Sequence, residues 1–332
     1  MENYEIIYAA DDGFAPILGV SLTSLFENNK GLDIHITIFD SGISEENRRK
    51  IESVFENYAQ PFPRWLTPQN IEKRLNMTVK SDRGSLAQYS RLYVQDAFEE
   101  SVKRILYLDC DTIITGTIKE LFSMDLKGKI IAGVKDAFSK YYRKNIGLDK
   151  QDLMINSGVY IIDVPKWKAL HIEDKMTDYI TKHKGNVQQG DQGVLNAILK
   201  DNIFVLSPRY NLMSIFYEYS YDDLIEYRKP VNFYSEDEIL KAKKSPIVIH
   251  YTSAFNTVRP WYKESTHPQT KEWLKYYKLS PWKDVALKSS TRSGIRKLLF
   301  DVYRFLPDKL ALEIASLFQV YIRPLKNELF NS

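Results

Sequence analysis

Two aspartates separated by a single residue follow an apolar run in the middle of the chain. Asp109 and Asp111 come directly after Arg104–Leu108, which has the composition of a buried strand. In an extended chain the side chains at positions i and i+2 point to the same side, so both carboxylates can face one cation. Two such charges repel each other unless something positive lies between them, and a hard divalent metal ion carrying phosphate oxygens suits that place. A solvated turn after a strand is the alternative interpretation of so short a motif.

A histidine late in the chain is a candidate third ligand. His250 follows the apolar run Pro246–Ile249, and neutral imidazole is a common metal ligand. Two carboxylates and one imidazole, together with phosphate oxygens, favour Mn²⁺ over Ca²⁺, with Mg²⁺ as an alternative ion. A hydrogen-bonded structural histidine is the competing interpretation.

Short apolar strands alternate with helical segments along most of the chain. This alternation predicts an α/β fold with a Rossmann-like, mostly parallel sheet flanked by helices. The predicted strands are Tyr4–Ala10, Ile34–Phe39, Arg104–Leu108, Ile130–Lys135, Val159–Asp163 and Pro246–Tyr251, and the predicted helices are Pro16–Asn28, one that begins at Ser44, Ser85–Phe98 and Asp191–Leu199. Ligands of such sheets bind beyond the carboxyl ends of the strands. The candidate site residues at predicted strand ends are Asp11, Asp12, Asp109, Asp111, Asp136 and His250.

A series of short motifs, taken in order, resembles glycosyltransferase family 8. These are retaining galactosyl- and glucosyltransferases that include bacterial lipopolysaccharide galactosyltransferases. The resemblance runs from about Tyr4 to Trp261. It is carried by Ala9-Ala10-Asp11-Asp12, Ser90-Arg91-Leu92, Leu106-Tyr107-Leu108-Asp109-Cys110-Asp111, Asn156-Ser157-Gly158-Val159, Gly190-Asp191-Gln192-Gly193-Val194-Leu195-Asn196, His250-Tyr251 and Arg259-Pro260-Trp261.

The resemblance implies a GT-A fold, a UDP-sugar donor and Mn²⁺ held by Asp109, Asp111 and His250. The positions that it implies for donor binding are Ala10, Asp11, Phe14, Arg91, Asp109, Cys110, Asp111, Asp136, Asn156, Ser157, Asp191, Gln192, His250, Ser253 and Arg259. Within this set, Asp11 matches a uracil contact and Phe14 an aromatic that stacks on the base. The structural alternative for Phe14 is packing of the first helix.

The sugar end of the implied site also has structural alternatives. Asp136, Asn156 and Asp191 match positions around the donor sugar, although Asn156 would equally cap a turn. Arg91 matches a donor contact, and its alternative is a surface charge on a helix. The chain departs from the family pattern at three positions: Ser253 stands where glycine is frequent, Arg259 replaces a lysine, and Gly13 replaces a residue that often helps to bind the nucleoside.

The residue nearest the reacting face of the sugar has consequences for the mechanism. The resemblance implies retention of configuration, and retention often involves a carboxylate nucleophile. The matching position here is Gln192, whose amide is a poor nucleophile. We therefore expect front-face attack in which the leaving phosphate accepts the proton of the acceptor, with Asp191 as the alternative nucleophile.

Composition narrows the class of protein and its location. The chain has 332 residues and a net charge of only +3, so it does not resemble a nucleic-acid binder as a whole. Its single cysteine, Cys110, excludes an internal disulfide and fits a reducing cytosol. We find no apolar run of membrane-spanning length. A cytoplasmic protein is expected.

The end of the chain differs from the rest. Residues 286–332 hold eight Lys/Arg and four Asp/Glu, whereas the preceding residues are almost neutral. We therefore expect a catalytic domain at 1–285 and a basic amphipathic helical tail at 286–332. Helical spacing predicts an apolar stripe at Ile295, Leu298, Leu299, Val302 and Phe305, and a second helix at Leu310–Ile322. The tail would lie peripherally on the inner face of the cell membrane, or dock on the catalytic domain or another subunit.

Two other functions remain open at this point. A metal-dependent nucleotidyltransferase also uses paired acidic residues, but Asp11-Asp12-Gly13 is acidic where such an enzyme has a basic phosphate loop. A non-catalytic UDP-sugar or carbohydrate-binding protein on the same fold is the second alternative. The acceptor of the favoured enzyme would be a glycan, a glycolipid or a glycoprotein.

Overall fold

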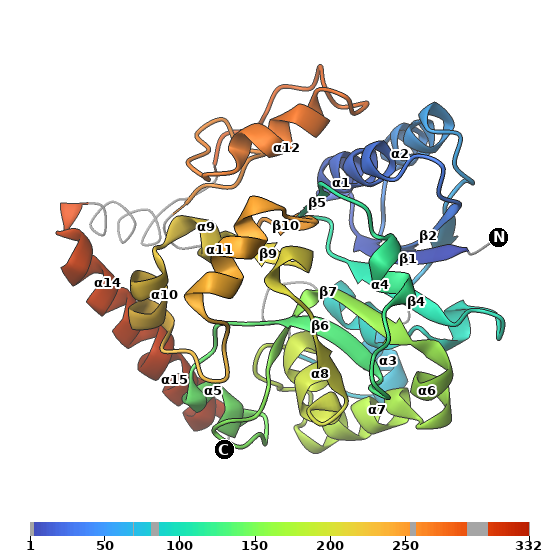
Figure 1. Cartoon of the computed structure of the whole chain (residues 1–332). Helices are drawn as coiled ribbons and strands as arrows, with labels where there is room; N and C mark the ends of the chain where they lie inside the picture. Colours follow the sequence, from blue (N-terminus) through green and yellow to red (C-terminus); the bar gives the residue numbers. More distant parts are fainter. Residues whose placement is uncertain (1–2, 69, 81–85, 253–256, 291–304, 332) are drawn as a thin grey trace.

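A seven-stranded sheet forms the centre of the protein. The computed structural model describes residues 3–68, 70–80, 86–252, 257–290 and 305–331. Within them the strand order of this large sheet is β3-β2-β1-β4-β7-β6-β8 (Figure 1). Its strands are β1 (Tyr4–Ala10), β2 (Ile34–Asp40), β3 (Arg64–Leu66), β4 (Arg104–Leu108), β6 (Ile131–Lys135), β7 (Ile155–Asp163) and β8 (Ile203–Val205).

One strand of the large sheet runs against its neighbours. The pairs β1–β2, β1–β4, β2–β3 and β6–β8 are parallel, which confirms the mostly parallel sheet, but β7 is antiparallel to both β4 and β6. Leu108 at the end of β4 pairs with Val159 in β7. The start of β7, with Asn156 and Ser157, therefore lies beside the carboxyl end of β4.

A second, three-stranded sheet holds the late strand. It contains β5 (Thr112–Ile114), β10 (Val248–His250) and β9 (Leu212–Met213), in that order. The expectation that Pro246–Tyr251 belongs to the main sheet is wrong, because β10 pairs antiparallel with β5 and parallel with β9. His250 lies opposite Thr112, and β5 follows β4 after only three residues. The pairing within the small sheet therefore still places His250 beside the end of β4.

Helices cover both faces of the large sheet, as in an α/β fold whose central strands are apolar on both sides. Ile6 and Tyr8 of β1 belong to the core shared with the first two helices, whereas Ile7 between them belongs to the core on the opposite face. The α-helices are α1 (Ala15–Asn28), α2 (Glu45–Asn57), α3 (Ile71–Leu75), α4 (Lys119–Ser123), α5 (Lys140–Asn145), α6 (Val164–Ala169), α7 (Ile172–Lys182), α8 (Asp191–Leu199), α9 (Ser214–Glu218), α10 (Tyr221–Arg228), α11 (Glu236–Lys244), α12 (Thr270–Tyr277), α14 (Asp308–Ser316) and α15 (Arg323–Asn331).

Local signals explain where some helices begin. Ser44 precedes α2, and its Oγ accepts a hydrogen bond from the backbone N–H of Asn47 at 3.3 Å. The predicted helix start at Ser44 is thus confirmed. A full capping box, with Ser235 and Glu238, begins α11.

The predicted helix Ser85–Phe98 is wrong in type. Its described part forms two 3₁₀ helices, η1 (Leu86–Leu92) and η2 (Gln95–Ala97). The buried carboxylate of Glu173 accepts hydrogen bonds from the backbone N–H groups of Val94 and Gln95, at 2.6 and 2.7 Å. These donors would otherwise continue a helix, so a residue on α7 divides the segment.

The C-terminal helices lie along one side of the molecule (Figure 1). The predicted helix Leu310–Ile322 is part of a longer run, in which α14 continues through a π-helix, η4 (Leu317–Ile322), into α15. The Tyr142 hydroxyl donates to the carbonyl of Gln319 at 2.9 Å, and Ser316 Oγ donates to the carbonyl of Glu226 at 2.9 Å. This part of the tail is therefore docked on α5 and α10. The stripe from Ile295 to Val302 lies outside the described residues, and the domain boundary after residue 285 stays a prediction.

Candidate active site

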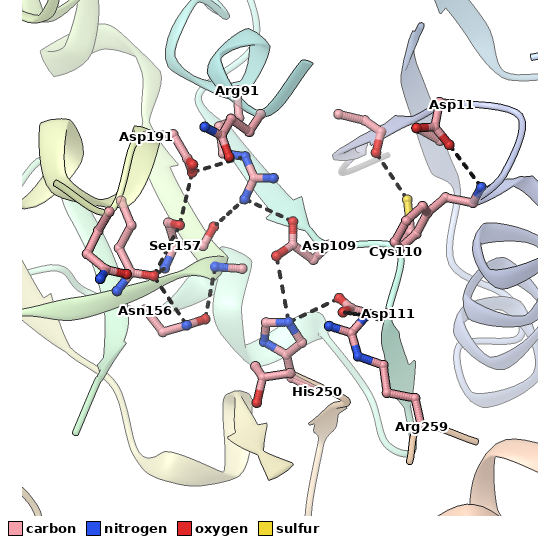
Figure 2. A pocket seen from close by; sticks show the side chains of 18 residues that line it. Asp11, Arg91, Asp109, Cys110, Asp111, Asn156, Ser157, Asp191, His250 and Arg259 are labelled. Atoms are coloured by element: carbon pink, nitrogen blue, oxygen red, sulfur yellow. Dashed lines mark hydrogen bonds and ion pairs between the residues drawn. The ribbon is translucent and has the colours of Figure 1, made fainter. Parts of the chain in front are cut away.

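A cavity of about 380 Å³ opens where the ends of β1 and β4, the start of β7 and the end of β10 meet. Its size is in the range of small-molecule sites. It is lined by Ala9, Ala10, Asp11, Phe14, Gln88, Arg91, Asp109, Cys110, Asp111, Asn156, Ser157, Gly158, Gln189, Asp191, Gln192, His250, Thr252 and Arg259. The structure thus gathers nearly all the predicted site residues in one place (Figure 2).

The three predicted metal ligands lie together at the floor of this cavity. One ligand atom from each of Asp109, Asp111 and His250 lies within 4.8 Å of the others. Nε2 of His250 is 3.6 Å from Asp109 Oδ2 and 3.1 Å from Asp111 Oδ1. Figure 2 shows the imidazole edge directed at both carboxylates. Two carboxylates and an imidazole form a suitable donor set for Mn²⁺.

The backbone of β7 leaves the space that this cluster needs. A Cβ placed on Gly158 would lie 2.2 Å from Cε1 of His250 and 2.7 Å from Oδ2 of Asp109. No side chain fits at such distances, so glycine allows the histidine and the aspartate to approach the strand.

A buried arginine connects the metal cluster with the rest of the site. Nη1 of Arg91 is 2.9 Å from Asp109 Oδ1, and its Nε is 3.4 Å from Asp191 Oδ2. The guanidinium also lies over the Tyr107 ring and donates to the carbonyl of Ser157. Burial alone would lower the pKa of Arg91, but Asp109 and its other neighbours outweigh burial and raise that pKa above its ordinary value. Arg91 is therefore no surface charge.

Amide and carboxylate groups meet at the opposite end of the cavity. Nε2 of Gln192 donates to Asp136 Oδ2 at 3.0 Å, and Nδ2 of Asn156 donates to the same oxygen at 3.1 Å. Oγ of Ser157 donates to Asp191 Oδ2 at 3.1 Å. Asp136 does not line the cavity itself but orients the two amides that do. Asn156 is thus part of the site rather than only a turn cap.

The residues predicted to bind the uracil base lie on the side of the cavity near the end of β1. Phe14 is 38% exposed, so its ring is not packed away beneath the first helix. The carboxylate of Asp11 accepts a hydrogen bond from the backbone N–H of Phe14 at 3.0 Å. Ala10 lines the wall, and Cys110 directs its thiol to the carbonyl of Ala9 at 3.1 Å. Burial raises the pKa of that thiol well above its usual value.

Asp12, a candidate by its place at a strand end, has a structural role instead. Its Oδ1 accepts hydrogen bonds from the backbone of Ser44 and the side chain of Asn47, both at 2.8 Å. It therefore ties the end of β1 to the start of α2 and does not line the cavity.

Arg259 lies at the rim above the metal cluster. Its Nη1 is 3.6 Å from Asp111 Oδ2, and its guanidinium lies over the ring of Trp261 at 5.1 Å from the centroid. The predicted donor residue Ser253 lies outside the described residues.

Several lining residues were missed from the sequence. Gln88 precedes Arg91 by three positions on a helical segment, and Thr252 follows His250 by two positions after a strand. Each spacing places the side chain on the same side as a predicted site residue, and this could have identified both. Among the described residues, the buried Nε2 atoms of Gln88 and Gln189 have no hydrogen-bond partner, and both residues line the cavity. Asn211, whose Oδ1 lies 2.9 Å from Nδ1 of His250, offered no signal because it stands in a short connection.

Comparison with known proteins agrees with this geometry. The model for glycosyl transferase family 8 matches residues 5–265. General stress protein A of Bacillus subtilis (strain 168) is 26% identical over 291 residues, covering 86% of this chain and 96% of that protein. Lipopolysaccharide 1,2-glucosyltransferase of Escherichia coli (strain K12) is 28% identical over 291 residues, covering 85% and 80%.

A solved structure shares the fold. The galactosyltransferase LgtC, in complex with donor and acceptor sugar analogues, matches with a TM-score of 0.69 at 22% identity, covering 84% of this chain and 99% of that one. This likeness confirms the expected GT-A fold. Because the family model spans most of the chain, from β1 to beyond Trp261, the protein belongs to glycosyl transferase family 8 and is an enzyme of the expected glycosyltransferase class.

Proposed function

We propose that this enzyme transfers glucose or galactose from a UDP-sugar to a glycan or glycoconjugate acceptor, with retention of configuration and with Mn²⁺. One observation carries the proposal: Asp109, Asp111 and His250 converge at the floor of a cavity that continues towards Phe14 on one side and Gln192 on the other. A nucleotide would occupy the first branch and a sugar the second, with the diphosphate near the three metal ligands.

The ligands named above would hold the ion, with Mg²⁺ as the alternative. The chemistry that such an ion supplies is neutralisation of the diphosphate and of the charge on departing UDP. Arg259 would add positive charge at the rim, and its planar guanidinium suits phosphate oxygens. Asp11 and Phe14 would bind the base, the latter by stacking. Gln88 and Gln189 add amide donors to the walls.

The groups around the sugar position favour front-face attack. Gln192 is neutral, and both ends of its amide are held, by the backbone N–H of Ser157 at 3.3 Å and by Asp136. The carboxylate of Asp191 has Arg91 and Ser157 as partners, which lowers its readiness to attack carbon. Asp191 and Gln192 would thus orient the sugar, and the departing phosphate would accept the proton of the acceptor hydroxyl.

The relatives support the choice of hexose and acceptor class. One is named a lipopolysaccharide 1,2-glucosyltransferase, and the matching solved structure is a galactosyltransferase bound to sugar analogues. Glucose and galactose differ in the orientation of one hydroxyl group, so the proposal includes both hexoses.

The decisive experiment measures UDP release from a panel of UDP-sugars, with and without Mn²⁺. We expect Mn²⁺-dependent release from one UDP-hexose, and loss of that release in Asp111→Asn. Asp125→Asn is the matched control, because Asp125 pairs with Lys127 at an exposed site away from the cavity. Absence of UDP binding by the wild-type protein would overturn the proposal. Tight UDP binding without release from any donor would mean that the reaction needs an acceptor that the assay lacks.

We also propose that the tail contacts an anionic membrane surface from the cytoplasmic side. No described helix is long and apolar enough to cross a membrane. The described tail nevertheless exposes large apolar side chains, among them Leu317 (52%), Phe318 (57%), Leu325 (55%) and Leu329 (66%). Exposed Lys309, Arg323 and Lys326 stand among them. A helix surface with this composition binds the lipid interface, where each basic residue adds about 1 kcal/mol.

A further inference from the structure

A buried asparagine connects the metal histidine to the residues around the donor sugar. Asn211 lies between the short 3₁₀ helix η3 (Pro208–Tyr210) and β9, and its side chain is fully buried. Its Oδ1 is 2.9 Å from Nδ1 of His250, and its Nδ2 is 2.9 Å from Oδ1 of Asn156. Asn211 does not line the cavity.

The donors and acceptors in this series of hydrogen bonds can be assigned by starting from Asn156, the end farthest from His250. Oδ1 of Asn156 faces the backbone N–H of Gly158 at 3.0 Å, and Nδ2 of Asn156 faces the carboxylate of Asp136 at 3.1 Å. A backbone N–H can only donate and a carboxylate only accept, so the orientation of the Asn156 amide is determined. The group of Asn211 that faces Asn156 Oδ1 must then be its NH₂.

The same logic reaches the imidazole. Because the NH₂ of Asn211 is directed at Asn156, its carbonyl oxygen faces His250, and Nδ1 of His250 must carry a proton to donate. With Nδ1 protonated, Nε2 is the nitrogen that faces Asp109 and Asp111, and its lone pair would be the one to bind a metal ion. Metal-binding histidines generally have such a partner, which fixes the tautomer and the ring orientation.

We propose that Asn211 is a positioning residue for the transfer reaction: it holds His250 in the Nδ1–H tautomer and links the metal site to Asn156 and Asp136 beside the donor sugar. The inference rests on the proposed function, because it assumes that His250 binds the ion. It goes beyond that function by making metal affinity depend on a residue that touches neither ion nor donor.

The first test examines the metal-free wild-type protein with ¹⁵N-labelled histidine. Long-range ¹H–¹⁵N spectra distinguish the two tautomers, and His250→Gln identifies the signal. We expect His250 to be protonated at Nδ1. A ring protonated at Nε2 alone would overturn the proposal whatever the variants do, whereas a ring protonated at both nitrogens keeps the Nδ1 proton and supports it.

The second test measures Mn²⁺ affinity from the paramagnetic resonance of the free ion, without donor. In Asn211→Ala we expect the affinity to fall by about 10- to 100-fold. Asn211→Asp keeps an oxygen that accepts from Nδ1–H, so its Mn²⁺ affinity should be much closer to that of the wild type than the affinity of Asn211→Ala. Its second oxygen opposes Asn156 Oδ1, so KM for the donor should stay raised.

The control is Asn29→Ala. Asn29 is also buried, but its side chain bonds the backbone of Leu25 and Ile118, away from the cavity. It should lower the unfolding temperature without changing Mn²⁺ affinity. Unchanged Mn²⁺ affinity in folded Asn211→Ala would overturn the proposal. So would an affinity that falls equally in Asn211→Asp and Asn211→Ala. A wild-type protein that binds no Mn²⁺ would instead contradict the proposed function.

Discussion

Nε2 of His250 lies 3.1 Å from Oδ1 of Asp111, although 139 positions separate the two residues in the chain. They meet because β10 pairs antiparallel with β5, which places His250 opposite Thr112, the neighbour of Asp111. The register of the small sheet therefore sets the geometry of the metal cluster, and Gly158 on the large sheet sets the space around it.

Gly158→Ala should disrupt the metal cluster. The added Cβ would lie 2.2 Å from the imidazole of His250 and must displace it. We expect Mn²⁺ affinity to fall by at least about tenfold, measured by titration of the folded protein. Gly133→Ala is the matched control, because its Cβ would be crowded by the side chain of Ile155, at 2.5 Å from Cδ1 and 3.3 Å from Cβ, and by no atom of the metal cluster. Equal Mn²⁺ affinity in the two variants would contradict this account.

Asp191→Asn distinguishes the two routes to retention. If Asp191 only orients the sugar, the variant should keep transfer within about 10²-fold of the wild-type kcat and the product should keep its anomeric configuration. Loss of a true nucleophile costs about 10⁶-fold. NMR of the product gives its anomeric configuration, and single-turnover kinetics give the rate of the transfer step. Abolished transfer with unchanged UDP-sugar binding would support the covalent route instead.

The stability of the protein should fall in mild acid because of His267. Desolvation, with a smaller effect of Arg259, lowers the pKa of buried His267 from 6.5 to about 4. Since the unfolded chain takes up the proton first, this contribution to stability is present above about pH 6.5 and is lost as the pH falls towards 4. The loss is on the order of 3 kcal/mol.

Urea unfolding at a series of pH values tests this contribution. His267→Gln should flatten the dependence of the unfolding free energy on pH, at some cost at neutral pH because Nε2 no longer contacts Ser214 Oγ as it does at 3.0 Å. His171→Gln, at an exposed histidine, should leave the dependence unchanged. The same slope in the His267 variant and the wild type would show that other groups cause it.

The apolar surface of the tail should determine membrane binding. Replacing Leu317, Phe318 and Leu325 with serine in the full chain should abolish co-sedimentation with phosphatidylglycerol vesicles and leave UDP release in solution unchanged. The control replaces three equally exposed apolar residues elsewhere, Phe62, Leu240 and Leu279. High salt should weaken the wild-type interaction. Equal vesicle binding by both triple variants would rule out this surface.

Much of the site was accessible from local sequence because its residues stand at the ends of strands. The bounds of β1, β4 and α8 agree with the prediction, since each has apolar periodicity bounded by polar or glycine residues. Most of the carboxylates and amides at these ends line the cavity as expected. Asp12 and Asp136 are exceptions: the start of α2 donates to the carboxylate of Asp12, and Asp136 accepts from the amides of Gln192 and Asn156 instead of lining the cavity.

Features set by distant pairing could not be predicted. The direction of β7 depends on its pairing with β4, and the separate sheet of β10 depends on β5 and β9, none of which leaves a local signal. Glu173 divides the segment around Val94 from 79 positions away. Asn211 acts through a single side chain in a connection without periodicity.

The short connection between β4 and β5 also has a consequence for folding. Only residues 109–111 separate the large sheet from the small one, so the chain passes between the sheets inside the metal cluster. The full ligand set exists only after β10, near the end of the catalytic region, has joined β5. Pairing across so many residues is slow to form, and metal affinity is coupled to the structure that gathers the ligands. The rate of Mn²⁺ uptake during refolding would therefore report when the small sheet is completed.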